Sequence, residues 1–304
     1  MKNPRCPICQ SAKTQHYAKR DSYSYHHCIP CNHVFLFPIP TSSTLHDLYA
    51  GDYEFRVNAD AKARFEELAG TILRRMKKLN PRGKTLLDVG AGYGTFVEIG
   101  LKHRLKALGI EPARNLYRQA KVRLGNKIIH TDLNGFVKRK GKMFDFISMI
   151  HVIEHVENPA NTLITLYQLL KPNGVLYIET PNIDSFLAYA EKSNYTFLTP
   201  PDHLNLFSPA SLKMLLTSLD HTIELRYSTY SYPEHFVGIL RELKSQVLRE
   251  HVSSRWSTKK TNTKDVDMVS ALPFFDRVVA PILTPLLNIG NRGSILQVYI
   301  KKMN

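Results

Sequence analysis

Between residues 84 and 180, short apolar runs alternate with longer stretches in which apolar residues recur at helical spacing. The short runs predict five strands, at 84–89, 106–110, 127–130, 144–150 and 174–180. The longer stretches predict helices at about 93–103, 112–123 and 159–170. Regular alternation of strand and helix is typical of a parallel sheet with helices on both faces, so we expect an α/β fold.

The flanking segments extend this pattern. A helix that runs to about residue 79 carries its apolar residues on one stripe. Later in the chain, a helix is predicted at about 208–219, and two further strands at about 221–229 and 294–300. The insertion between these two strands, about 232–292, is basic and polar in its first half and apolar in its second. We expect this insertion to form a lid.

The chain has 304 residues and a formal net charge of +15. The length suits one large domain, or one with a small added module. The charge favours an anionic partner, such as nucleic acid, an acidic membrane face or a phosphorylated substrate, or else it is a basic solvated surface. No apolar signal-peptide core follows Met1, and the longest apolar stretch is shorter than the roughly 20 residues of a membrane span. We therefore expect a soluble, cytoplasmic protein.

All four cysteines lie near the N-terminus, in two Cys-x2-Cys pairs separated by 18 residues: Cys6, Cys9, Cys28 and Cys31. Paired turns of this kind direct four thiolates toward one point, which is typical of a tetrahedral zinc site. A shell of four thiolates leaves no open position for a substrate, so the zinc would be structural. A redox pair or a disulfide is the alternative. The segment resembles a zinc ribbon, with strands entering and leaving the second pair.

The stretch LLDVGAGYGTFVE, residues 86–98, holds the most informative motif. A predicted strand ends in Asp88, and Gly90, Gly92 and Gly94 follow before a helix begins. The glycines alternate as GxGxG, whereas a dinucleotide-binding turn reads GxGxxG, which disfavours a nicotinamide oxidoreductase. The strand, the acidic residue and the glycines together resemble motif I of the class I S-adenosylmethionine (SAM)-dependent methyltransferases.

Later blocks strengthen this resemblance. ALGIEPA, HTDL, FDFISMIHVIEHVENP, KPNGVLYIETPN and HLNLFSPASLKMLL are similar to segments of the methyltransferases of ubiquinone biosynthesis and related enzymes. The resemblance covers about residues 84–230 and the last strand. It implies a Rossmann-like sheet of seven strands, and acceptors that are small molecules, sugars or lipid-linked compounds. The expected domains are then a zinc ribbon at 1–40, a linker and cofactor-capping helix at 41–83, and the methyltransferase domain at 84–304.

The resemblance also assigns the cofactor site. The glycines let bare backbone approach SAM, Asp88 would accept from its ammonium group, and Glu111 would bind both ribose hydroxyls. Asp132 would accept from the adenine amino group, and its neighbour Leu133 would contact the ring. The alternatives are a surface glutamate at 111 and a helix cap at 132. The complete expected set is Asp88, Gly90, Ala91, Gly92, Gly94, Glu111, Pro112, Asp132, Leu133 and Ile150.

Methyl transfer needs an aligned acceptor and, for some acceptors, a general base. His155 is the first candidate for that base, followed by His151 and His203, and a structural or capping role is the alternative for each. Some relatives carry an ExxEH segment that holds a divalent cation. Here the segment reads HxxEH, so a second metal ion is not expected.

The leading hypothesis is a SAM-dependent methyltransferase with a small-molecule, sugar or lipid-linked acceptor. The second is a nucleic-acid methyltransferase that grips RNA or DNA with its ribbon and basic insertion. The third is a non-catalytic binding module, which the intact Asp88, glycines and Glu111 disfavour. For the apolar half of the insertion, two interpretations stay open. It could make a shallow contact with an anionic membrane, or it could pack as ordinary helices over the sheet edge.

Overall fold

The structure is a computed structural model that describes residues 4–50, 59–139, 142–217, 224–232, 235, 239 and 280–303. Contacts within the chain divide it into two compact units. We call Ile39–Thr180, Met214–Arg226 and Val298–Asn304 the sheet unit. The ribbon unit consists of Met1–Pro38, Pro181–Lys213 and Tyr227–Gln297.

The predicted alternation of strands and helices is confirmed. The elements that carry it are β4 (Thr85–Val89), α3 (Thr95–Lys102), β5 (Lys106–Glu111), α4 (Arg114–Leu124), β6 (Ile128–His130), β7 (Phe144–Ile150), α6 (Pro159–Leu169) and β8 (Leu170–Pro181). The predicted helix before β4 is α2 (Ala59–Leu79), and the predicted later elements are α8 (Pro209–Thr217), β10 (Glu224–Tyr230) and β11 (Ile295–Lys301).

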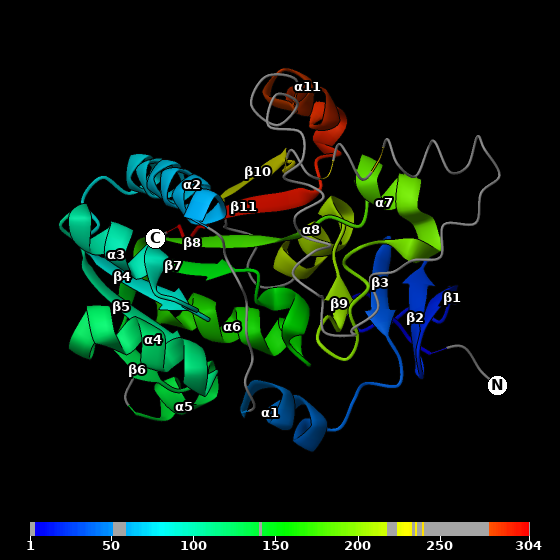
Figure 1. Ribbon diagram of the computed structural model, residues 1–304, viewed down its shortest axis with the longest axis horizontal. Coiled ribbons are helices and arrows are strands. Elements are labelled where there is room, and N and C mark those ends of the chain that lie inside the picture. Colours follow the sequence, from blue (N-terminus) through cyan, green and yellow to red (C-terminus); the bar gives the residue numbers. More distant parts are fainter. Residues whose placement is uncertain are drawn as a thin grey trace. The chain divides into compact units, whose positions relative to one another are not determined.

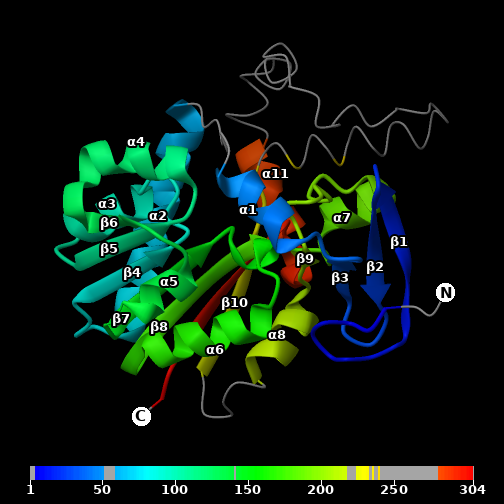
Figure 2. The same cartoon turned by 90° about the horizontal axis from the view of Figure 1, so that it is seen from below.

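Seven strands form one sheet in the order β10-β11-β8-β7-β4-β5-β6, as expected for this fold class. The pairs β5–β6, β4–β5, β4–β7 and β7–β8 are all parallel. Helices α2, α3 and α4 cover one face of these strands, and α6 and the short α5 (Leu133–Lys138) cover the other (Figures 1 and 2). The chain reverses its direction of winding between β4 and β7. In such a sheet, ligands bind at the carboxyl ends of the strands beside this reversal.

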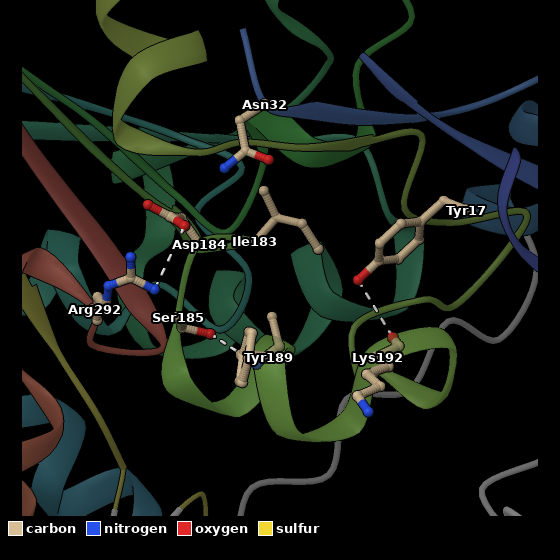
Figure 3. Close-up of a pocket in the computed structure, with 9 residues that line it drawn as sticks. Tyr17, Asn32, Ile183, Asp184, Ser185, Tyr189, Lys192 and Arg292 are labelled. Carbon is tan, nitrogen blue, oxygen red and sulfur yellow. Dashed lines mark hydrogen bonds and ion pairs between the residues drawn. The ribbon is translucent and has the colours of Figure 1, made fainter. Parts of the chain in front are cut away.

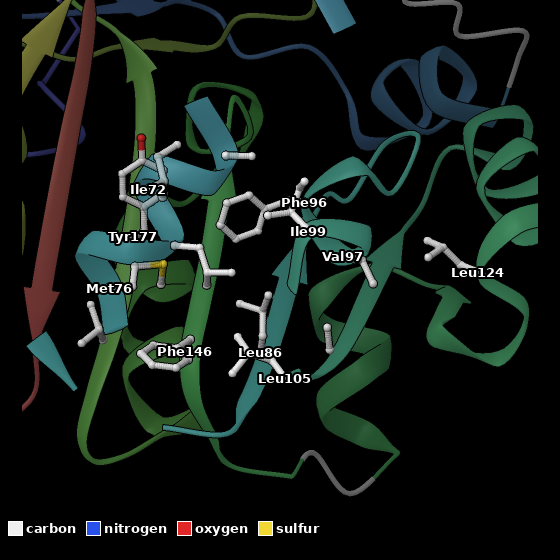
Figure 4. Packing of buried hydrophobic residues seen from close by; sticks show 14 of the residues in the cluster. Ile72, Met76, Leu86, Phe96, Val97, Ile99, Leu105, Leu124, Phe146 and Tyr177 are labelled. Carbon is white, nitrogen blue, oxygen red and sulfur yellow. The ribbon is translucent and has the colours of Figure 1, made fainter. Parts of the chain in front are cut away.

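The core of the sheet unit explains why these segments form these elements (Figure 4). The apolar stripe of α2, with Ile72 and Met76, packs on buried residues of α3 and the sheet, among them Phe96, Leu86 and Phe146. All five side chains are at most 2% exposed. Burial of each contributes roughly 1.5–3 kcal/mol. This packing fixes the position of β4 and therefore of the turn that follows it.

The ribbon unit contains a second, antiparallel sheet in the order β1-β2-β3-β9. Its strands are β1 (Thr14–Arg20), β2 (Tyr23–Cys28), β3 (His33–Leu36) and β9 (Asn205–Leu206). Strand β9 comes from far along the chain and pairs with β3. The same unit holds α7 (Phe186–Glu191) and α11 (Ala280–Leu287).

Several elements differ from the expectations. The stretch expected to be a linker contains α1 (Ser42–Ala50), and α5, α7, β1 and β9 were not expected. Most of the expected lid, and residues 218–223 at the start of the expected strand 221–229, lie outside the described residues. Within the part that is described, no helix has the length and apolar character needed to cross a membrane.

Candidate functional site

In the glycine turn after β4, the backbone at Gly92 has open space beside it. Gly90 and Ala91 both donate their N–H groups to the Ile110 carbonyl at 3.0 Å, which closes the turn onto β5. Gly92 has a φ of +52°, and an added Cβ there would meet nothing within 4 Å. At Gly90, by contrast, an added Cβ would lie 2.4 Å from Val152 Cγ2. A ligand can therefore approach the backbone most closely at Gly92.

Gly92→Ala tests this opening against a matched control. Gly125 also has a positive φ, +55°, and open space around its Cβ position. Alanine at either glycine should therefore strain the backbone and lower stability by about 1–3 kcal/mol, with the larger loss at Gly125, whose ψ of −123° lies outside the left-handed helical region. Only Gly92→Ala should also weaken binding of a ligand at the turn, by about tenfold. Urea unfolding and calorimetry of both variants check this, and equal binding by the two would contradict it.

Glu111 joins the end of β5 to the glycine turn. Its Oε2 accepts from Gly92 N at 2.7 Å, and its Oε1 accepts from Ala113 N at 2.7 Å. The side chain is buried, and burial raises its pKa above the ordinary value, while the two backbone hydrogen bonds lower it. Each carboxylate oxygen has a further lone pair. The group can therefore still accept two hydrogen bonds from a diol.

Asp88 lies near the end of β4, opposite Ser148 on the neighbouring strand β7. It is 3% exposed, and Ser148 Oγ on β7 donates to its Oδ1 at 2.7 Å. Burial raises the pKa of Asp88 to about 7, the Ser148 hydrogen bond opposes this shift, and the charge of Glu111 adds to it. A cation bound beside this carboxyl would favour its ionised form.

The pKa of Asp88 predicts a pH-dependent stability. The folded protein binds this proton more tightly than the unfolded chain, so ionisation destabilises the fold as the pH rises from about 4 to about 7. Ionisation of the buried carboxyl costs the wild type about 4 kcal/mol at high pH, at 1.36 kcal/mol per pKa unit. The buried amide of Asp88→Asn needs partners of its own and costs about 2 kcal/mol at any pH. Without a bound cation, Asp88→Asn should therefore be about 1–2 kcal/mol less stable than the wild type at pH 4 and about 2 kcal/mol more stable at pH 8.

Asp145 provides a control of opposite sign. Burial raises its pKa, but hydrogen bonds from Thr85, Lys84 and Lys171 outweigh burial and lower it. Asp145→Asn should therefore lose stability relative to wild type at pH 8. Urea unfolding at both pH values measures the two variants, and a pH-independent effect of Asp88→Asn would contradict the assignment.

A buried network follows β7 and β8. His151 Nδ1 lies 3.2 Å from Glu154 Oε1, and its Nε2 lies 3.4 Å from Glu179 Oε1. The remaining oxygens accept from Thr180 Oγ1, at 3.0 Å, and from the Tyr177 hydroxyl. Both carboxylates are fully buried. Burial lowers the pKa of His151, but the two glutamates outweigh this effect and raise it to about 10, so the imidazole is a cation at neutral pH.

The remaining expected cofactor residues lie along the same edge of the sheet unit. Asp132 caps α5 by accepting from Gly135 N at 2.7 Å, and its side chain is exposed. Leu133 begins α5 and is half-buried, whereas Ile150, at the end of β7, packs against the core. The Pro112 carbonyl accepts from His130 Nε2 at 3.0 Å.

Three contacts near this edge were missed by sequence reasoning. His130 stacks on Tyr117, with ring centroids 5.0 Å apart. Arg123 donates to the Tyr93 carbonyl in the glycine turn, and to Glu98 Oε1, both at 2.6 Å. None of these three pairs follows a local spacing, because each joins residues that only the fold brings together.

The other two histidine candidates differ in their surroundings. His155 lies in a short 3-10 helix (Ile153–His155) of the sheet unit and is half-buried. His203 belongs to the ribbon unit, where its Nδ1 lies 2.8 Å from the Phe197 carbonyl and its ring stacks on Phe197. A carbonyl only accepts hydrogen bonds, so Nδ1 of His203 carries the proton, and in the neutral ring the basic lone pair is on Nε2.

The four cysteines of the ribbon unit come together. Their sulfurs all lie within 4.8 Å of one another, with Cys6–Cys31 at 3.6 Å and Cys9–Cys28 at 3.4 Å. Thiolates on one tetrahedral zinc ion lie about 3.8 Å apart, given Zn–S bonds of about 2.3 Å, whereas a disulfide would need about 2.05 Å. Ile8 N also donates to Cys6 Sγ at 3.4 Å. This donor set fits a tetrahedral metal ion.

The ribbon unit also has an open depression of about 300 Å³ (Figure 3). Arg292 and Asp184 form a 3.9 Å ion pair on one side, and the Tyr17 hydroxyl donates to the Lys192 carbonyl on the other. None of the expected cofactor or catalytic residues lines this depression.

Comparisons with known proteins agree with the fold. Two plantazolicin methyltransferases have the same fold: BamL has a TM-score of 0.52 at 15% identity over 87% of this chain and 92% of its own. BpumL has a TM-score of 0.52 at 18% identity over 86% of this chain and 95% of its own.

Curated relatives include ubiquinone biosynthesis O-methyltransferases. That of Aromatoleum aromaticum is 30% identical over 112 residues, which are 35% of this chain and 47% of the relative. That of Coxiella burnetii is 25% identical over 146 residues, 45% of this chain and 62% of the relative. The chain thus spans about half to two thirds of the length of these relatives. A family model described as a methyltransferase domain matches residues 61–224, more than half of the chain. The chain therefore belongs to the class I SAM-dependent methyltransferases.

Proposed function

We propose that the protein transfers a methyl group from SAM to a small-molecule, sugar or lipid-linked acceptor. The observation that carries this proposal is the 2.7 Å hydrogen bond from Gly92 N to Glu111 Oε2. It places the acidic end of β5 against the open glycine of the turn, which is the arrangement needed to hold a ribose beside bare backbone.

The cofactor would be bound through complementary charge and hydrogen bonds. Glu111 accepts from both ribose hydroxyls with its remaining lone pairs. Asp88 pairs with the ammonium group, which favours its ionised form. Asp132 and Leu133 face the adenine, and Ala91, Pro112 and Ile150 line the site. When bound, SAM supplies a sulfonium methyl that needs no covalent help from the protein.

The acceptor would bind at the ends of β7 and β8, since the cofactor occupies those of β4 and β5. His151 is held as a cation, so it does not serve as the base. We propose His155 as the first candidate, because it follows this network directly and is half-buried. His203 is the second, because its tautomer leaves Nε2 basic. Loss of the acidic limb of the pH–rate profile in His155→Gln or His203→Gln would identify the base.

The ribbon would hold one structural zinc ion on Cys6, Cys9, Cys28 and Cys31, with no step of the reaction at the metal. Four sulfur ligands complete a tetrahedral shell, which excludes a water or substrate ligand. We propose no second metal ion, because the first position of the HxxEH segment is His151, whose two nitrogens both face carboxylates.

The relatives support an acceptor of the small or lipid-linked class. Those matched by sequence are named for O-methylation in ubiquinone biosynthesis. Tritiated SAM incubated with metabolite extracts and, in parallel, with RNA tests the proposal. We expect label in low-molecular-weight products. Label in RNA would favour the nucleic-acid alternative, and absence of transfer to any acceptor would contradict the proposal.

A further inference from the structure

The loop after β7 connects the buried network to the glycine turn. Val152 lies between His151 and Glu154 in the sequence, and its Cγ2 occupies the space where a Cβ on Gly90 would project. The Val152 side chain is therefore in direct contact with Gly90. Any movement of this loop changes the wall of the turn.

His151 fixes the loop at its first residue. Its φ of +52° is a left-handed conformation that non-glycine residues rarely adopt unless their surroundings hold them. Its backbone N–H donates to the Glu179 carbonyl at 2.9 Å, and its two ring nitrogens face Glu154 and Glu179. Three interactions thus tie one residue to β8 and to the 3-10 helix.

The hydrogen bonds and ion pairs of this network hold the side chains of Glu154 and Glu179 in place. All four carboxylate oxygens of Glu154 and Glu179 face a donor, and two of these donors are the ring nitrogens of His151. Loss of the imidazole would leave two buried carboxylates without their shared cation, which is the costly way to break a buried ion pair. We expect the loop, rather than the strands, to move in response, because each strand is held in the sheet by hydrogen bonds to its neighbours along its whole length.

We propose that His151 is a positioning residue for the cofactor: clamped between Glu154 and Glu179, it holds Val152 against Gly90 and so sets the shape of the SAM-binding turn. This inference rests on the proposed function. His151 acts through Val152 and need not touch the cofactor.

Calorimetry with SAM tests the inference on the full, metal-loaded chain. We expect His151→Gln to raise the Kd for SAM about tenfold. The double variant His151→Gln/Glu179→Gln should recover part of this loss, because it removes one of the uncompensated charges. In the absence of SAM, the amides of residues 90–92 and 151–155 should exchange their hydrogens faster in His151→Gln than in the wild type.

Lys171→Met is the matched control. It breaks another partly buried ion pair, Lys171–Asp145 at 3.0 Å, at the opposite, amino end of the same strands. It should lower the melting temperature without changing the Kd for SAM. Equal weakening of SAM binding in this control would show a general loss of stability and overturn the inference.

Val152→Ala covers the case in which His151→Gln does not fold. It leaves the network intact and removes the contact with Gly90, so it should also raise the Kd. An unchanged Kd in Val152→Ala, or in a folded His151→Gln, would overturn the inference. The proposed function would still stand in that case, as long as the wild type binds SAM. No binding of SAM by the wild type would overturn both.

Discussion

Replacing Glu111 by alanine should weaken SAM binding by about 1000-fold, or about 4 kcal/mol. The complex would lose two charge-assisted hydrogen bonds between the carboxylate and the ribose, each worth about 1.5–3 kcal/mol. The substitution would also leave Gly92 N without the Glu111 oxygen that accepts from it at 2.7 Å. Glu111→Gln should fall between wild type and alanine, because an amide oxygen still accepts but the amide nitrogen does not. Calorimetry of SAM and of its demethylated product measures these differences.

Glu66→Ala is the control for charge removal. Glu66 lies on α2, where its side chain is 35% exposed and forms a 3.9 Å pair with Lys62. This variant should bind SAM as the wild type does. If a folded Glu111→Ala variant also retained wild-type affinity, the assignment of the ribose to β5 would be wrong.

Removing the proposed zinc ion should unfold the N-terminal part of the ribbon unit. Zinc binding by four thiolates contributes on the order of 10 kcal/mol, more than most domains have as net stability. We expect about one zinc ion per wild-type chain by mass spectrometry, bound at the proposed four-cysteine site, and loss of this ion in Cys28→Ser. Amides of residues 14–36 should then exchange rapidly, because β1, β2 and β3 meet at the cysteines.

Ser22→Ala is the control for the metal experiment. Ser22 is exposed in the turn between β1 and β2. This variant should keep its zinc and its slow exchange. The redox alternative makes a different prediction, a native mass lower by about two daltons for each disulfide formed. Such a mass, without bound zinc, would contradict a metal site.

The central parallel strands β4, β7 and β8 were predictable because they are largely buried on both faces and therefore read as apolar runs. The run around Leu86 and Leu87 is the clearest, since both side chains are fully buried. The short helices α5 and α7 were missed because six residues are too few to show a helical period. Strand β9 has two residues, and only its pairing with β3 defines it.

The site was predictable to the extent that strand ends define it. Asp88 and Glu111 follow strands directly, and parallel strands bring their carboxyl ends to one edge. Glu179 had no such signal, because it lies within a long apolar strand, and only the neighbouring β7 brings His151 to it. The charge of His151 depends on that pairing. A histidine that the sequence offers as a candidate base therefore lies between two buried glutamates in the structure.

Calorimetry of the purified, zinc-loaded wild type with the demethylated product of SAM is the most direct measurement. We expect one binding site per chain, with heat that disappears in Glu111→Ala and persists in Glu66→Ala. Absence of heat with both SAM and its product would contradict the central claim that the β4 and β5 ends hold this cofactor.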